Sequence, residues 1–169
     1  MKRHYLLTAA LLLAATGIHA AGPTSERPSD AAAFARLKTL VGEWGANTKM
    51  GKAHLSYELI AGGTALVERE THENMPAMLT VYHLDGDRLM LTHYCMAGNQ
   101  PRMRMEAFNP ETGEVQFQFQ DATNLSPNGG HMHDAKLRLT DSDHLAAEWE
   151  FYENGQRKMT ESAQYIRVR

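Results

Sequence analysis

The sequence predicts an all-β protein, an antiparallel up-and-down barrel of about ten strands that follows one short helix. From Gly42 almost to the C-terminus, apolar and polar residues alternate with a period of two, as in strands that bury one face. Short clusters of Gly, Asn, Asp and Pro separate these segments and are typical of hairpin turns. A sheet of many such strands removes its exposed edges best by closing on itself.

The expected helix spans residues 31–40, where Phe34, Leu37 and Leu40 recur at helical spacing. Ser29 or Asp30 precedes it and is a suitable N-cap, because the side-chain oxygen of either residue accepts a hydrogen bond from the first turn. We expect this helix to cover one end of the barrel.

The strands that follow are expected to be short and regular. In chain order they span about 42–48, 53–60, 65–72, 78–84, 88–96, 102–108, 115–121, 131–140, 144–152 and 158–168. Hairpin-type turns are expected at 61–63, 85–87, 109–113, 141–143 and 153–155. The longest irregular stretch, 122–130, predicts a flexible loop at the mouth of the barrel.

Residues 1–20 have the three parts of a secretory signal peptide: a basic start at Lys2 and Arg3, an apolar run over 6–18, and small-residue cleavage signals at 18–20. The apolar run is shorter than the roughly 20 residues of a membrane-spanning helix. We therefore expect a periplasmic or secreted protein without a membrane span. Residues 21–28 are expected to form a flexible leader, and 29–169 the barrel domain.

The composition narrows the function. Removal of Lys2 and Arg3 lowers the formal charge from −3 to about −5, and the chain has no basic patch, so nucleic acid is not an expected partner. Cys95 is the only cysteine and cannot form an internal disulfide. Known motifs for hydrolases, zinc proteases, nucleotides and dinucleotides are absent. An enzyme is therefore the less favoured class.

Several segments together are similar to a known kind of barrel. The Gly-x-Trp at 42–44, which opens the first strand after a short helix, resembles the first-strand motif of lipocalins and other calycins. With the segments 59–69, 81–87 and 91–95, the chain resembles a family of secreted bacterial calycin-like proteins of unassigned function. The resemblance implies a ten-stranded barrel and a small ligand, and it implies no known reaction. It also predicts that Trp44 is buried at the closed end.

Strand alternation predicts the interior lining. In 131–139 the charged residues occupy even positions, so His131 and His133 are expected to point inward. Phe117 and Phe119 in the preceding strand and Trp149 in the following one would give an aromatic wall beside them. The leading hypothesis is a non-enzymatic barrel that binds a small, partly apolar molecule in this lumen. The full predicted set of ligand-binding residues is His131, His133, Phe117, Phe119, Trp149, His93 and Cys95.

Metal binding and haem binding are the alternatives. Two histidines at i and i+2 of a strand can converge on one ion, but His131 and His133 would need His93 or Cys95 as a further ligand of a metal-binding protein or metal-dependent hydrolase. Met103 and Met105 suggest Cu(I), although methionine is more often a core residue. Nitrobindin-like barrels hold haem through a late histidine, whereas the last strand here has none. The sequence identifies no cofactor and no oligomeric state.

Overall fold

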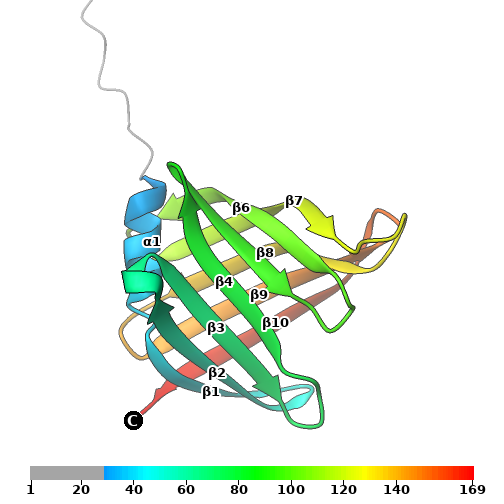
Figure 1. The fold of residues 1–169 in the computed structure, drawn as a ribbon. Helices are drawn as coiled ribbons and strands as arrows, with labels where there is room; N and C mark the ends of the chain where they lie inside the picture. Colours follow the sequence, from blue (N-terminus) through cyan, green and yellow to red (C-terminus); the bar gives the residue numbers. More distant parts are fainter. Residues whose placement is uncertain (1–28) are drawn as a thin grey trace, which may run out of the picture.

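The computed structural model describes residues 29–169 and confirms the predicted all-β fold. Ten antiparallel strands form a closed barrel in the order β1-β10-β9-β8-β7-β6-β5-β4-β3-β2, which is an up-and-down topology (Figure 1). The expected signal peptide and leader, 1–20 and 21–28, lie outside the described residues. Between Ser29 and Arg169 no helix is long and apolar enough to cross a membrane.

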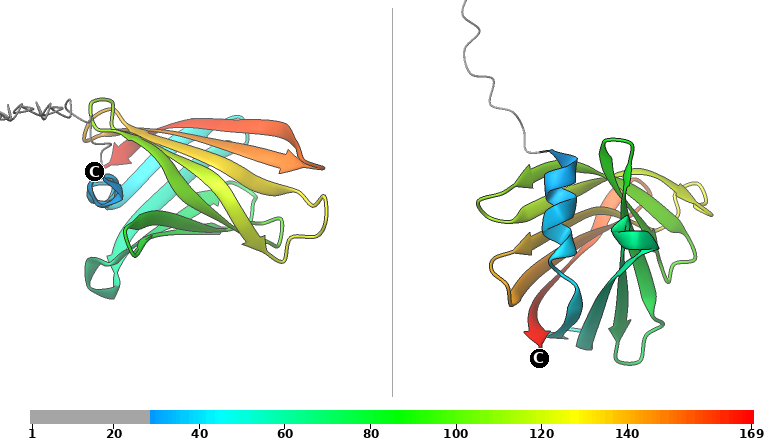
Figure 2. Two further views of the ribbon diagram at one scale, coloured as in Figure 1. Left: turned by 90° about the horizontal axis from the view of Figure 1, so that it is seen from above. Right: turned by 60° about the vertical axis from the view of Figure 1, so that its left-hand side comes forward.

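The helix α1, Asp30–Lys38, lies over one end of the barrel, as Figure 2 shows. Ser29 is its N-cap and accepts a hydrogen bond from the Ala32 amide at 3.1 Å. Asp30 accepts a hydrogen bond from the Leu89 amide at 2.7 Å, and the Arg36 guanidinium donates to the Leu139 carbonyl at 2.9 Å. These two contacts attach both ends of the helix to strands, so this end of the barrel is closed.

The strand bounds differ from the expected ones by at most two residues at each end. They are Gly42–Thr48 (β1), Gly51–Ile60 (β2), Ala65–His72 (β3), Met78–Asp85 (β4), Arg88–Tyr94 (β5), Gln100–Asn109 (β6), Glu114–Thr123 (β7), His131–Leu139 (β8), His144–Glu153 (β9) and Gln156–Val168 (β10). A short 3₁₀ turn, Ala61–Gly63 (η1), joins β2 to β3. Because β7 continues to Thr123, the loop at the mouth is shorter than 122–130.

Trp44 is fully buried beside the helix, as the sequence predicts. Its indole Nε1 donates to the Leu40 carbonyl at 2.8 Å, and the Arg167 guanidinium lies over the ring, 4.1 Å from its centroid. Arg167 also donates to the carbonyls of Val41 at 2.7 Å and Thr39 at 2.9 Å. The Arg167 side chain on the last strand therefore contacts the end of the helix, the residue before the first strand and the indole of Trp44.

The barrel opens along one seam at the end opposite α1. β1 and β10 pair only where Glu43–Gly45 meet Ile166–Val168. Figure 1 shows β10 and β1 meeting near the C-terminus and diverging from there. The remainder of β10, including Glu161, therefore has β9 as a paired neighbour and none on the β1 side.

The alternation expected for 131–139 fails at its beginning. A register shift between Met132 and Asp134 in the β8–β9 pairing leaves His133 without a paired partner. A bulge of this kind inserts one residue and reverses the face of those beyond it. Met132 is therefore the buried core residue, while His131 and His133 are both half-buried. The expected alternation, with odd positions buried and even positions exposed, therefore does not extend to Met132 at the start of the strand.

Candidate ligand-binding interior

A row of polar side chains crosses the inner wall of four consecutive strands. Tyr57 on β2 lies directly opposite Glu68 on β3, Glu68 opposite Thr80 on β4, and Thr80 opposite His93 on β5. Directly opposed side chains on one face of antiparallel strands have Cβ atoms about 4.5–5.5 Å apart. The register alone therefore makes these four groups neighbours.

Hydrogen bonds connect most of this row. Glu68 Oε2 accepts from the Tyr82 hydroxyl at 2.7 Å, and Glu68 Oε1 accepts a long bond from the Thr80 hydroxyl at 3.5 Å. Thr80 Oγ1 shares a further hydrogen bond with His93 Nδ1 at 3.0 Å. The network residues are all buried, with exposed fractions of 3% or less: Tyr57, Glu68, Thr80, Tyr82 and His93. The interior thus contains a polar network where an apolar core would suffice for stability.

Burial changes the charge state of both ends of the network. Burial raises the pKa of Glu68 to about 7, and the nearby charge of Glu70 adds to this effect. Burial also lowers the pKa of His93 to about 4. The His93 imidazole is therefore uncharged at neutral pH and presents hydrogen-bonding nitrogens without a net charge.

One polar atom of this network, His93 Nε2, is fully buried and has no hydrogen-bond partner in the protein. An unpaired buried polar group costs about 1–3 kcal/mol. Buried side-chain groups are nearly always paired in native proteins, so this nitrogen calls for a partner from outside the chain.

Two of the predicted aromatic residues, Phe117 and Trp149, lie against the network. Trp149 lies 5.0 Å from His93 between ring centroids, and Phe117 lies 5.8 Å from Tyr82. Phe117 and Trp149 are both buried in the core. The interior therefore combines aromatic surface with an unpaired polar atom, which is the usual composition of a small-molecule site.

His131 and His133 form a separate cluster at the rim. Phe119 lies 4.6 Å from His131 and 4.9 Å from His133, and Tyr152 stacks on His133 at 4.1 Å. His131 Nε2 and His133 Nδ1 share a hydrogen bond at 3.1 Å. No aromatic contact joins this described pair to Trp149, so the expected single wall is two clusters.

Cys95 does not act as an activated thiol in this arrangement. It packs partly buried against the core, and its sulfur accepts a hydrogen bond from the Ala97 amide at 3.5 Å. Burial raises the pKa of the Cys95 thiol, which disfavours the thiolate that a nucleophile needs. Partial burial and a raised thiol pKa both fit the interpretation of Cys95 as a small side chain that packs against the core.

A second polar cluster lies near the open seam. His72 Nε2 is 2.7 Å from Glu70 Oε1 and 4.0 Å from Glu161 Oε1. Within residues 29–169 it is the only group of three potential metal-ligating side chains that come together. The group contains neither His131 nor His133, so it differs from the alternative metal site that sequence analysis considered, with His93 or Cys95 as a further ligand.

The sequence analysis missed Tyr57, Glu68, Glu70 and His72. The signal was present in the alternation of β3, where Leu66, a buried core residue, shares its face with Glu68, Glu70 and His72. Carboxylates on the same face as a core leucine indicate a polar interior.

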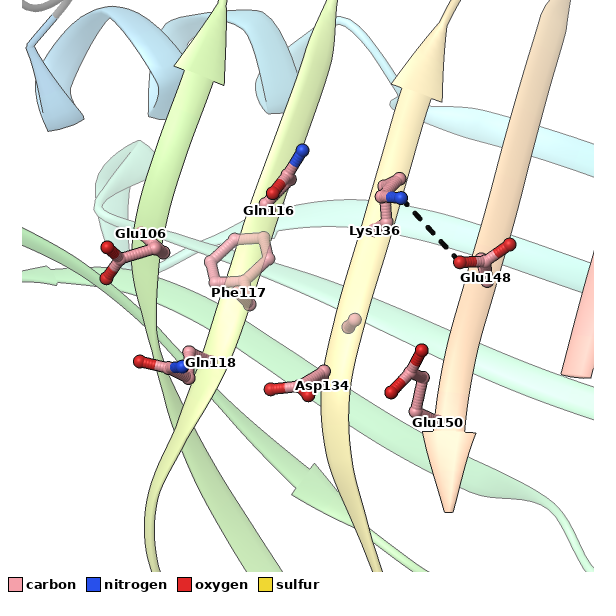
Figure 3. A pocket seen from close by; sticks show the side chains of 9 residues that line it. Glu106, Gln116, Phe117, Gln118, Asp134, Lys136, Glu148 and Glu150 are labelled. Carbon is pink, nitrogen blue, oxygen red and sulfur yellow. Dashed lines mark ion pairs between the residues drawn. The ribbon is translucent and has the colours of Figure 1, made fainter. Parts of the chain in front are cut away.

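A shallow hollow of about 240 Å³ lies on the outer face of β6 to β9, shown in Figure 3. Its polar lining includes Lys136, which lies 3.7 Å from Glu148, and the further carboxylates of Glu106, Asp134 and Glu150. This is the solvated face expected from the charged even positions of β8, and it stands apart from the polar interior.

Comparison with known proteins shows a likeness of fold. No protein-family model and no curated protein matches the sequence. The barrel is similar to the crystal structure of a protein of unknown function from the DUF3598 family of Nostoc punctiforme, with 12% sequence identity and a TM-score of 0.50. The match covers 78% of this chain and 49% of that chain, so this chain spans about half the length of its neighbour.

Proposed function

We propose that this protein binds a small, uncharged and partly apolar molecule inside its barrel, as calycin-like proteins do. The observation that carries the proposal is His93 Nε2, a buried and unpartnered nitrogen on a ring that packs against Trp149. A hydroxyl, carbonyl or amide of the ligand would pair with this nitrogen. The apolar remainder would lie against Trp149 and Phe117.

Charge favours a neutral ligand over an anion. The buried polar residues of the described chain include Glu68 and no lysine or arginine, and Glu70 and Glu161 stand near the same interior. A carboxylate ligand would meet negative charge without a basic partner, which is unfavourable at low dielectric. A neutral group pairs with His93 and avoids this repulsion.

The cluster at the rim fits the mouth of such a site. Phe119, His131 and His133 are half-buried, and the Asn99 amide donates to the Gly130 carbonyl at 2.8 Å, which holds the neighbouring loop. We infer that these side chains contact a ligand as it enters, while His93 and Trp149 hold it and Cys95 lines the wall between them. From the signal peptide expected at 1–20, we infer that this activity takes place in the periplasm or outside the cell.

Native mass spectrometry of protein purified from the periplasm, without detergent, tests the proposal. We expect a small neutral molecule that is retained in the native spectrum and lost on denaturation. The variant His93→Phe keeps a flat ring but removes the nitrogen, so it should retain less of the molecule. The matched control His54→Phe changes a histidine whose side chain is 50% exposed and should retain as much as the unsubstituted chain. Equal retention by both variants would contradict the assignment of His93.

A further inference from the structure

We propose that Glu70, His72 and Glu161 bind one divalent transition-metal ion at the open end of the barrel. Each side chain offers one ligand atom, and these atoms all lie within 4.8 Å of one another. Zinc binds nitrogen and carboxylate oxygen at about 2.0–2.2 Å, so ligand atoms around one ion stand roughly 3–4 Å apart. The observed separations of 2.7 Å and 4.0 Å from His72 Nε2 bracket that spacing.

The fold brings these residues together from two strands that are not paired with each other. Glu70 and His72 occupy i and i+2 of β3 and share one face. Glu161 comes from β10, which is separated from β3 by β1 and β2 in the barrel order. At the level of His72, the intervening strands carry Ala53 and Ala46, directly opposed in one row. Their small side chains and the open seam let Glu161 reach across.

The charge of the cluster calls for a cation. Glu70 and Glu161 are both largely buried, with side chains 12% and 21% exposed. The buried Glu68 lies on the same face of β3, two residues before Glu70. No lysine or arginine belongs to the buried residues of the part of the chain that the structure describes. Closely spaced buried carboxylates are destabilising unless a positive charge offsets them, and a divalent ion does so most effectively.

His72 supplies the nitrogen donor of the group. Its side chain is completely buried, and its Nε2 is the nitrogen that faces both carboxylates. The other nitrogen, Nδ1, is buried without a hydrogen-bond partner in the protein. Imidazole nitrogen and carboxylate oxygen are both ligands that zinc accepts, and imidazole also binds iron.

Three protein ligands leave a coordination position open. Glu161 also lines a hollow of about 320 Å³ between β10 and the end of β1 with its following turn, together with Thr48, Lys49, Met50 and Met159. The open position therefore has a route to solvent, as in metal sites that take up an exogenous ligand. This site is distinct from the His131 and His133 pair, in which His131 Nε2 and His133 Nδ1 share a hydrogen bond.

Titration of the chelator-treated full chain with Co²⁺ tests the proposal. Glu161 lies directly opposite Trp149 in the β9–β10 pairing, so one bound Co²⁺ should quench Trp149 fluorescence and give visible absorption bands. The Trp149→Phe variant retains only the fluorescence of Trp44. Subtracting its spectrum from that of the unsubstituted chain therefore leaves the fluorescence of Trp149. We expect saturation at one equivalent and competition by Zn²⁺.

Two variants and two controls complete the design. Glu161→Gln and His72→Gln should each weaken Co²⁺ binding by at least roughly tenfold, because loss of even an outer-shell partner lowers metal affinity about 10–100-fold. Glu148→Gln, on the outer face of β9, should leave binding unchanged, as should the double change His131→Ala with His133→Ala. A thermal melt of each variant establishes that it is folded.

Three results would overturn the proposal. They are the absence of saturable Co²⁺ binding to the unsubstituted chain, unchanged affinity in folded Glu161→Gln, and loss of binding in the double histidine variant. Absence of saturable Co²⁺ binding would mean that His72 is a protonated partner of Glu70 in a structural ion pair. Loss of binding in the double histidine variant would mean that the ion binds at the rim, at His131 and His133.

Discussion

The imidazole ring of His93 lies against the indole of Trp149, with 5.0 Å between ring centroids and 39° between ring planes. The two residues come from β5 and β9, which are four strands apart in the barrel order, so their contact crosses the interior. Any molecule that pairs with His93 therefore changes the surroundings of Trp149. The contact joins the polar network of β2 to β5 to the aromatic wall of β7 to β9.

Stability should depend on pH through His93. Burial lowers its folded-state pKa to about 4, whereas the unfolded chain takes up a proton near the ordinary value of about 6.5. As pH falls from about 6.5 to about 4, the unfolded state binds the extra proton and stability decreases, by roughly 3 kcal/mol at most. Above about 6.5 this contribution no longer changes.

Urea unfolding at a series of pH values, with chelator present, measures this contribution. The free energy of unfolding of the unsubstituted chain, minus that of His93→Phe, should shrink or change sign as pH falls from about 6.5 to about 4. The reason is that the variant has no imidazole to protonate at this position. Contributions from Glu68, whose raised pKa acts in the opposite direction, are common to both proteins and cancel. If the free energies of unfolding of the two proteins ran parallel across this pH range, the pKa of His93 would be the same in the folded and unfolded chain.

Trp44 should be a major source of stability at the closed end. Trp44→Ala removes a fully buried indole, its hydrogen bond to Leu40 and the surface over which Arg167 lies, so it should cost about 3–5 kcal/mol in urea unfolding. The control Tyr94→Ala removes an aromatic ring that is 49% exposed and should change stability by no more than about 0.5 kcal/mol. A loss below about 1 kcal/mol for Trp44→Ala would refute this role.

Gly113 and Gly155 provide a matched pair of glycines. Both have φ of 67°, so alanine is equally strained in the backbone at either position. At Gly113 an added Cβ would collide with the Leu139 carbonyl oxygen, whereas at Gly155 nothing lies within 4 Å. Gly113→Ala should therefore be the more destabilising change in thermal unfolding, by more than about 1 kcal/mol. Equal effects would mean that the Gly113 turn moves away from Leu139 without resistance.

Export should remove the first residues of the chain. The basic start, apolar run and small residues of 1–20 predict a mature protein that begins near Ala21 in the periplasmic fraction. N-terminal sequencing of that fraction is the measurement. A chain that still begins at Met1 and stays with the cytoplasm would refute the signal-peptide prediction.

The sequence predicted the barrel well because local signals determine it. Period-two alternation and hairpin turns define each strand of a meander, and Gly42 and Trp44 mark its beginning. The site was harder to predict, because Glu161 meets His72 only after the barrel closes. The bulge at His133 likewise depends on the partner strand β9, and alternation alone did not predict that Met132 is buried.

Calorimetric titration with octanol and octanoate tests the central claim most directly, because the two probes share a chain length and differ in the charge of the polar group. We predict that octanol binds and octanoate binds more weakly, and that His93→Phe weakens octanol binding roughly two- to tenfold, the value of one neutral hydrogen bond. His54→Phe should leave both affinities unchanged. Absence of octanol binding, tighter binding of octanoate, or an unchanged octanol affinity in folded His93→Phe would contradict a neutral-ligand site at His93.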